Sequence, residues 1–103
     1  MTESIVNAVF LRSRAGKEEE LAGRLQELVL ASRSDCGVMI YDLHRSSADP
    51  ASWFLYERYE SEEHFNRHRT NPVLRRFVAD AATLLDGKLD VRTFSVINDL
   101  HGA

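Results

Sequence analysis

Four short strand-like runs, separated by helical stretches, constrain the fold of this chain more than any other feature of its sequence. Each run is rich in apolar, β-branched or aromatic residues and is bounded by turn residues. The runs are residues 5–11, 38–45, 53–59 and 89–97. Helical stretches follow the first and the third runs, which gives the element order βαββαβ. This order predicts an α+β, ferredoxin-like fold in which helices cover one face of a four-stranded antiparallel sheet.

The helical stretches are recognised by apolar residues that recur at a spacing of three or four. The first helix is expected over residues 17–33, and Ser61 is expected to cap the second. Asn71-Pro72 separates the second helix from a third helical piece. The buried face of the first helix should consist of Leu21, Leu25, Leu28, Val29 and Ser32. The buried stripe of the third piece should consist of Leu74, Phe77, Val78, Ala81 and Leu85.

Size, charge and cysteine content limit the class of protein. The 103 residues suffice for one domain, which is expected to span residues 1–103. The formal net charge of −3 argues against a nucleic-acid partner, because nucleic-acid binders usually carry a basic excess. The lone cysteine, Cys36, fits a reducing compartment. No signal peptide is visible, and no stretch approaches the roughly 18 apolar residues of a membrane span, so a cytoplasmic protein without membrane contacts is expected.

The predicted strands carry apolar residues on both faces, which indicates a homodimer. In the second strand, Val38 and Ile40 are expected on one side and Met39, Tyr41 and Leu43 on the other. A sheet with one face in water should instead alternate apolar and polar residues. Helices can cover only one face, and the other would expose a larger apolar patch than a monomer normally shows. A second copy, packed sheet against sheet, is the simplest cover.

Two polar residues stand in otherwise apolar strands and are candidates for a site. Asn7 is either a structural residue bonded to a neighbour or a pocket residue that orients a substrate oxygen, because a buried amide must be hydrogen-bonded. Glu57 shares a strand face with Trp53, Leu55 and Tyr59. A salt bridge to one of the chain's arginines is the simpler interpretation of Glu57. Without such a partner, burial would raise its pKa and suit it to act as a general base.

Histidines provide the remaining candidates for chemistry. His68 is expected beside Phe65 on the inner face of its helix, either as a structural residue or as a catalytic group. His64 lies four residues before His68, the spacing of a metal pair, but no third ligand is evident and no metal site is predicted. The chain has no glycine-rich phosphate loop, no CxxC pair and no nucleophile elbow, so no cofactor is expected.

A local basic patch begins between these two histidines and continues after them in the sequence. Its members are Arg67, Arg69, Arg75 and Arg76. The simpler interpretation is a solvated helix face. The alternative is that the patch steers an anion or a substrate towards the protein.

Residues 36–46 (CGVMIYDLHRS) and 53–61 (WFLYERYES), followed by Phe65, His68 and Asn71-Pro72, resemble a known family. The family is the antibiotic biosynthesis monooxygenase domain, and the resemblance extends over nearly the whole chain. It implies a dimeric α+β barrel with a pocket between sheet and helices. Some members oxidise quinols or anthrone-like polyketides with O₂ and no cofactor. Relatives degrade haem or act on a phosphorylated signalling molecule.

The resemblance also implies roles for individual residues. Asn7 corresponds to a first-strand asparagine that many members use in the pocket, and Glu57 and His68 correspond to polar positions that line it. This chain has Tyr59 where members often have tryptophan, and Val73 where they often have a histidine. These two departures argue against the haem-degrading branch.

The leading hypothesis is a cofactor-independent monooxygenase that oxidises an electron-rich aromatic substrate, such as a quinol or an anthrone, with O₂. His68 or Glu57 would remove a proton, and Asn7 and Tyr59 would hold the developing oxyanion. The aromatic wall that binds the ring would consist of Trp53, Tyr59 and Phe65.

Two alternatives belong to other functional classes. One is an isomerase or related enzyme acting on a small polar metabolite, and the basic patch would favour a phosphorylated one. The other is a non-catalytic ligand-binding dimer. In that case the pocket would be filled by side chains, and Asn7, Glu57 and His68 would be bonded only to one another.

Overall fold

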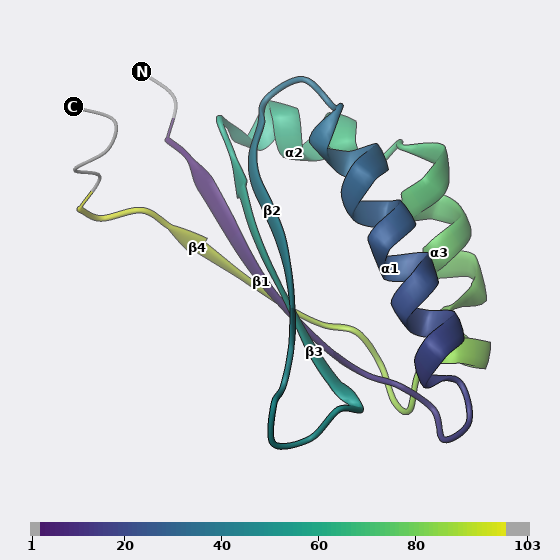
Figure 1. The fold of residues 1–103 in the computed structure, drawn as a ribbon. Helices are drawn as coiled ribbons and strands as arrows, with labels where there is room; N and C mark the ends of the chain where they lie inside the picture. Colours follow the sequence, from purple (N-terminus) through teal and green to yellow (C-terminus); the bar gives the residue numbers. More distant parts are fainter. Residues whose placement is uncertain (1–2, 99–103) are drawn as a thin grey trace.

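The helices of this chain lie on one face of a four-stranded antiparallel sheet in a computed structural model that describes residues 3–98 (Figure 1). The strands are β1 (Ile5–Arg12), β2 (Val38–Arg45), β3 (Ser52–Tyr59) and β4 (Asp90–Ser95). The helices are α1 (Glu18–Arg33), α2 (Glu62–His68) and α3 (Pro72–Leu84). The strand order is β2-β3-β1-β4, so the predicted ferredoxin-like fold is confirmed. The fourth strand is shorter at both ends than the predicted 89–97.

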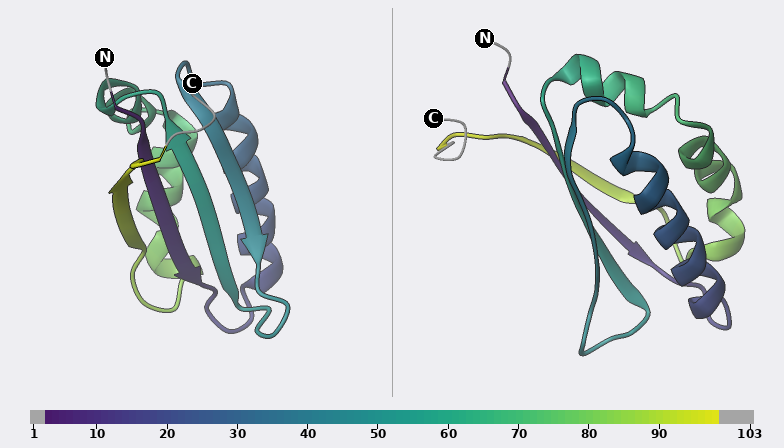
Figure 2. Two further views of the ribbon diagram at one scale, coloured as in Figure 1. Left: turned by 90° about the vertical axis from the view of Figure 1, so that its left-hand side faces the viewer. Right: turned by 45° about the horizontal axis from the view of Figure 1, so that its top comes forward.

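The helices bury one stripe each against the sheet, with α1 behind β2 and α3 behind β1 (Figure 2). All five residues predicted for the buried face of α1 are buried. In α3, Phe77 and Leu84 are buried and Ala81 packs against the core, which is a spacing of four and three residues. Val78 is 53% exposed, so its place in the predicted stripe is wrong. It lies about 100° around the helix axis from Phe77, at the edge of the buried stripe.

Polar caps set where the two short helical segments begin. The Ser61 side chain accepts a hydrogen bond from the backbone N–H of His64, at 3.3 Å, which confirms the predicted cap of α2. The Asn71 side chain accepts from the N–H of Val73 and caps α3, where Pro72 occupies the first turn. No helix within residues 3–98 is long and apolar enough to cross a membrane.

A β-bulge in β2 changes which of its residues face the helices. Val38 lies opposite Tyr59, whereas Ile40 lies opposite Arg58, with the register shift between them. Residues directly opposite each other in neighbouring strands share a face. Val38 therefore points to the helices and Ile40 points away, so the predicted grouping of these two residues is wrong. The extra residue, Met39, shifts the alternation of the strand by one step.

The face of the sheet that points away from the helices has an aromatic centre. Phe10 and Phe54 stack with their ring centres 5.1 Å apart, and the His44 ring stacks on Phe54 at 5.2 Å. Phe10 is 41% exposed and Phe94 is 53% exposed on the same face. We call this surface the open face. Its exposed aromatic rings are the feature that a second protein surface would cover.

Candidate active site

A cavity of about 200 Å³ lies between the sheet and the helices. Its apolar wall consists of Val9, Leu28, Leu55, Phe65, Leu74, Phe77, Val78, Leu89 and Val91. Its polar floor consists of Asn7, Tyr41, Glu57 and His68. Val78 and Val91 are about half exposed, and Arg69 is exposed, so these three residues mark the opening. An apolar chamber with a few convergent polar groups is the usual form of a small-molecule site.

One transverse row of the sheet provides most of the polar floor. Asn7 of β1 lies opposite Thr93 of β4 on one side and Glu57 of β3 on the other. Glu57 in turn lies opposite Tyr41 of β2. These four residues, one from each strand, are called the polar row. The next row on the same face is entirely apolar and consists of Val91, Val9, Leu55 and Leu43.

Hydrogen bonds connect the members of the polar row to each other and to the row beside it. The Thr93 hydroxyl donates to Asn7 Oδ1 at 2.8 Å. The Tyr59 hydroxyl donates to Glu57 Oε1 at 2.5 Å. The Asn7 and Tyr41 side chains also lie near the Glu57 carboxyl and lower its pKa. No arginine within residues 3–98 forms an ion pair with Glu57, so the salt-bridge interpretation of this residue is wrong.

The surroundings of Glu57 make it a titratable group near neutral pH. Burial raises the pKa of Glu57 to about 7, although the Tyr59 hydrogen bond and the polar groups of Tyr41 and Asn7 favour the ionised form. Burial also raises the pKa of both tyrosines above the ordinary value, and the nearby Glu57 charge adds to the shift. Both hydroxyls therefore remain protonated and act as donors. The carboxyl of Glu57 can bind or release a proton at neutral pH.

His68 is the second titratable group at the floor of the cavity. It is 2% exposed, and its ring centre lies 5.3 Å from that of Tyr41 and 5.4 Å from that of Tyr59. Its Nδ1 lies 3.0 Å from Asp35 Oδ2. Because an ionised carboxylate can only accept a hydrogen bond, Nδ1 carries the proton in this pair. The other ring nitrogen, Nε2, is then the basic atom of the neutral ring.

Asp35 is itself held in place by Asn71. The Asn71 Nδ2 donates to Asp35 Oδ2 at 3.0 Å and to the Ala31 carbonyl at 3.3 Å. Sequence reasoning missed both residues. Asp35 lies 33 positions before His68, in a turn that already explains its presence by ending a helix. Asn71 was explained as part of a helix break, so neither residue carried a local signal.

The structure brings together four of the residues expected in the site. Asn7, Glu57, His68 and Phe65 all line the cavity. Tyr59 does not line the cavity but supports two residues that do. Its hydroxyl donates a hydrogen bond to Glu57, and its ring centre lies 5.1 Å from that of Phe65.

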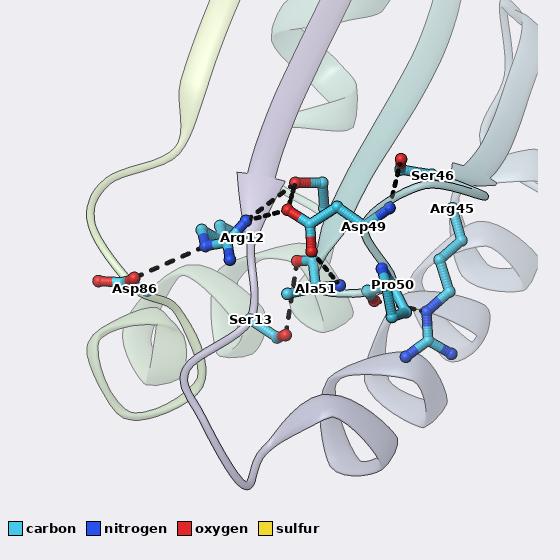
Figure 3. A network of polar contacts seen from close by, with 9 residues as sticks. Arg12, Ser13, Arg45, Ser46, Asp49, Pro50, Ala51 and Asp86 are labelled. Atoms are coloured by element: carbon cyan, nitrogen blue, oxygen red, sulfur yellow. Dashed lines mark hydrogen bonds and ion pairs between the residues drawn. The ribbon is translucent and has the colours of Figure 1, made fainter.

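Trp53 lies away from the cavity, at the other end of β3. The Arg45 guanidinium lies 4.6 Å from the centre of its ring. A polar network closes this end of the sheet, where Arg12 binds Asp49 in the β2–β3 turn and lies 3.8 Å from Asp86 (Figure 3). Arg12 hydrogen bonding holds the pKa of Asp49 below its ordinary value. Trp53 and Phe65 therefore do not form one aromatic wall.

The two histidines of α2 point to different partners. His64 Nδ1 lies 2.7 Å from the Ser61 hydroxyl, and Nε2 lies 3.8 Å from Glu60. Within residues 3–98, no three side chains of His, Cys, Asp or Glu gather in a way that could hold a metal ion.

Comparison with known proteins identifies the family. Residues 4–80 match the model of the family described as antibiotic biosynthesis monooxygenase. The chain belongs to this family. A protein of Bacillus subtilis (strain 168) named "Putative monooxygenase YcnE" is 29% identical over 87 residues, which cover 84% of this chain and 92% of that protein.

Solved structures of other proteins show the same fold. PA3566 from Pseudomonas aeruginosa superposes with a TM-score of 0.88 at 22% identity, covering 95% of this chain and 98% of the other. Rv0793 from Mycobacterium tuberculosis superposes with a TM-score of 0.88 at 22% identity, covering 94% of this chain and 98% of the other. A protein of Nitrosomonas europaea named "Putative antibiotic biosynthesis monooxygenase" superposes with a TM-score of 0.86 at 18% identity, covering 94% of this chain and 93% of the other. Family membership supports a monooxygenase-type role.

Proposed function

We propose that this family member oxidises a single-ring quinol with O₂ and without a cofactor. The observation that carries the proposal is an apolar cavity whose floor joins Glu57, His68 and Asn7. An apolar cavity of about 150 Å³ in another protein accepts benzene. A cavity of about 200 Å³ therefore suits one aromatic ring and favours a quinol over a three-ring anthrone.

His68 is the base in this proposal. Its Nδ1 is engaged by Asp35, so Nε2 takes the phenolic proton of the quinol. The Glu57 carboxyl, in its protonated form, donates to a quinol oxygen, and the Asn7 amide lies beside it in the polar row. The apolar wall excludes water and strengthens these interactions.

The proposed reaction needs no outside reductant. The phenolate passes one electron to O₂, and the ring radical and superoxide then combine to form a C–O bond. The peroxide takes up the proton, and the O–O bond breaks with loss of water. One quinol and one O₂ thereby give one hydroxyquinone and one water. The four electrons that reduce O₂ all come from the quinol.

Oxygen uptake by the purified, metal-stripped protein tests this proposal. We expect saturable uptake with single-ring quinols above the rate of autoxidation, and weaker uptake with anthrones. Conversion of a substrate without oxygen consumption would favour an isomerase. Absence of any saturable uptake across the quinols would contradict the proposal.

The non-catalytic alternative fits the geometry less well. It requires a filled pocket in which the three polar residues bind only one another. Asn7 is bonded to Thr93, Glu57 to Tyr59 and His68 to Asp35, and the cavity beside them is open.

Replacement of Asp35 by alanine is expected to lower kcat by about 10²-fold with a small effect on KM, because His68 loses the partner that fixes its proton on Nδ1. The Asp35 side chain is 29% exposed, so added formate or acetate can enter the space that its carboxylate leaves beside His68. Partial recovery of kcat with formate is expected, and a purely structural loss would not respond to it. Asp42→Ala is the control, since Asp42 pairs with Arg33 at the surface.

We also propose that the open face is the interface of a homodimer. Phe10→Asp is expected to convert the dimer to a monomer in light scattering at micromolar concentration, because it places a charge among stacked aromatic rings. Leu30→Asp is the control, because Leu30 is 72% exposed on α1, on the helix side of the sheet. A monomeric wild-type protein would contradict this interface.

A further inference from the structure

Nearly all basic side chains of this protein have an oxygen partner. The chain contains 13 lysines and arginines, all within residues 3–98. Ten of them form an ion pair or a hydrogen bond through the side chain. Within the described part of the chain, the exceptions are Arg69, Arg75 and Lys88. Arg69 lines the opening of the cavity, and Arg75 lines a hollow next to it.

Arg69 directly follows α2 and lines the cavity, and Arg75 of α3 lies near its opening. Arg69 lines the cavity directly after His68, and its guanidinium carbon lies 5.9 Å from the ring centre of Phe65. Arg75 adjoins a second hollow that it shares with Arg69, Leu74 and Val78. Arg69, Leu74 and Val78 also line the cavity, so the second hollow adjoins its opening and places Arg75 beside Arg69 there.

This placement has an electrostatic consequence. The chain is acidic overall, with a formal charge of −3, and its other arginines are largely neutralised by neighbours. Two unpaired guanidinium groups make the entrance locally positive and attract anions. The apolar wall behind them cannot accommodate a charge without a large desolvation cost. A ligand that satisfies both regions places an uncharged ring inside and an anionic group outside.

We propose that the substrate is a quinol with an anionic side chain, a carboxylate or a phosphate, that binds Arg69 and Arg75. Guanidinium groups suit both anions, because their planar donors match two oxygens at once. The identity of the ring rests on the proposed function, whereas the charge of the side chain rests on the arginines alone.

Anaerobic calorimetry with matched quinols tests this proposal without turnover. The probes are 2,5-dihydroxyphenylacetate, its methyl ester, and 2-(2,5-dihydroxyphenyl)ethyl phosphate. We expect the wild type to bind at least one of the two anions about tenfold more tightly than the ester at low salt. The preferred anion identifies the group. The advantage should shrink as added salt screens the exposed arginines.

Variants locate the anion contact. Arg69→Gln and Arg75→Gln should each weaken binding of the preferred anion several-fold and leave the ester unchanged. Arg76→Gln is the matched control on the same helix, because Arg76 already pairs with Glu27, and it should behave as wild type.

Equal binding of the ester and both anions would overturn the proposal, as would an equal loss for all probes in Arg69→Gln. Failure of all three probes to bind would also overturn it. Anion preference without any oxygen uptake would uphold the anion contact and count against the oxygenase alone.

Discussion

Replacing His68 by alanine is expected to lower kcat for quinol oxidation by about 10²–10⁴-fold, with KM nearly unchanged. The base acts on the phenolic proton in the transition state, whereas the apolar wall that binds the ring remains in place. Oxygen uptake at saturating quinol measures the effect.

A loss of kcat in His68→Ala must be distinguished from a loss of folding. His68 is 2% exposed and packs against Tyr41 and Tyr59, so its removal leaves a gap in the structure. His68→Gln fills more of that gap and is expected to lose kcat as well. His64→Gln is the control on the same helix, since His64 binds Ser61 and does not line the cavity. Full turnover in a folded His68→Ala protein would exclude His68 as the base.

Replacing Glu57 by glutamine is expected to stabilise the protein at pH 8 and to have little effect at pH 4. The pKa of Glu57 is about 7 in the folded protein, against an ordinary value of 4.5. The folded state therefore holds its proton more tightly than the unfolded state. The wild type accordingly loses stability as pH rises from about 4.5 to about 7, and the loss is complete above that range. The difference amounts to about 3 kcal/mol.

Denaturant unfolding of both proteins across this pH range measures the effect. The free energies of unfolding of the two proteins should nearly coincide at pH 4 and diverge as pH rises. All measurements use one protein concentration, because association would also change the apparent stability. Glutamine keeps an oxygen that can accept the Tyr59 hydroxyl, so the comparison isolates the charge. Glu62→Gln, at an exposed position of α2, is the control and should follow the wild type. Parallel curves for Glu57→Gln and wild type would contradict the raised pKa.

Features set by local pattern were predictable from the sequence. The element order, the buried face of α1 and the Ser61 cap depend on residues close together in the chain, and all three are confirmed. Asn7, Glu57 and His68 were also recognisable, because a polar residue inside an apolar pattern stands out without knowledge of its partners.

Features set by position along a strand were not predictable in the same way. Trp53 and Tyr59 share a strand face, but six residues of strand separate them by about 20 Å, so one ring cannot contact both. The alternation of side chains along a strand predicts which face of the sheet a residue lies on. It does not predict which residues on that face are close enough to contact one ligand.

Contacts between residues far apart in the chain could not be predicted either, for a related reason. Tyr41 meets Glu57 only through the register of two strands, which the bulge at Met39 displaces. Asp35 meets His68 across 33 residues. The sequence offers many arginines as partners for Glu57, and only the packed sheet shows that tyrosines occupy that place.

The polar row has a consequence for how such a protein can diverge. Its four residues come from four strands but occupy a single step of the sheet, while the apolar row beside it holds the strands together. Substitutions confined to that step would alter the reaction and spare much of the packing that maintains the fold. A scaffold organised in this way can acquire new substrates through substitutions at few positions. Of the four residues, Tyr41 alone also belongs to the hydrophobic core, so substitution at Asn7, Glu57 or Thr93 would disturb that core least.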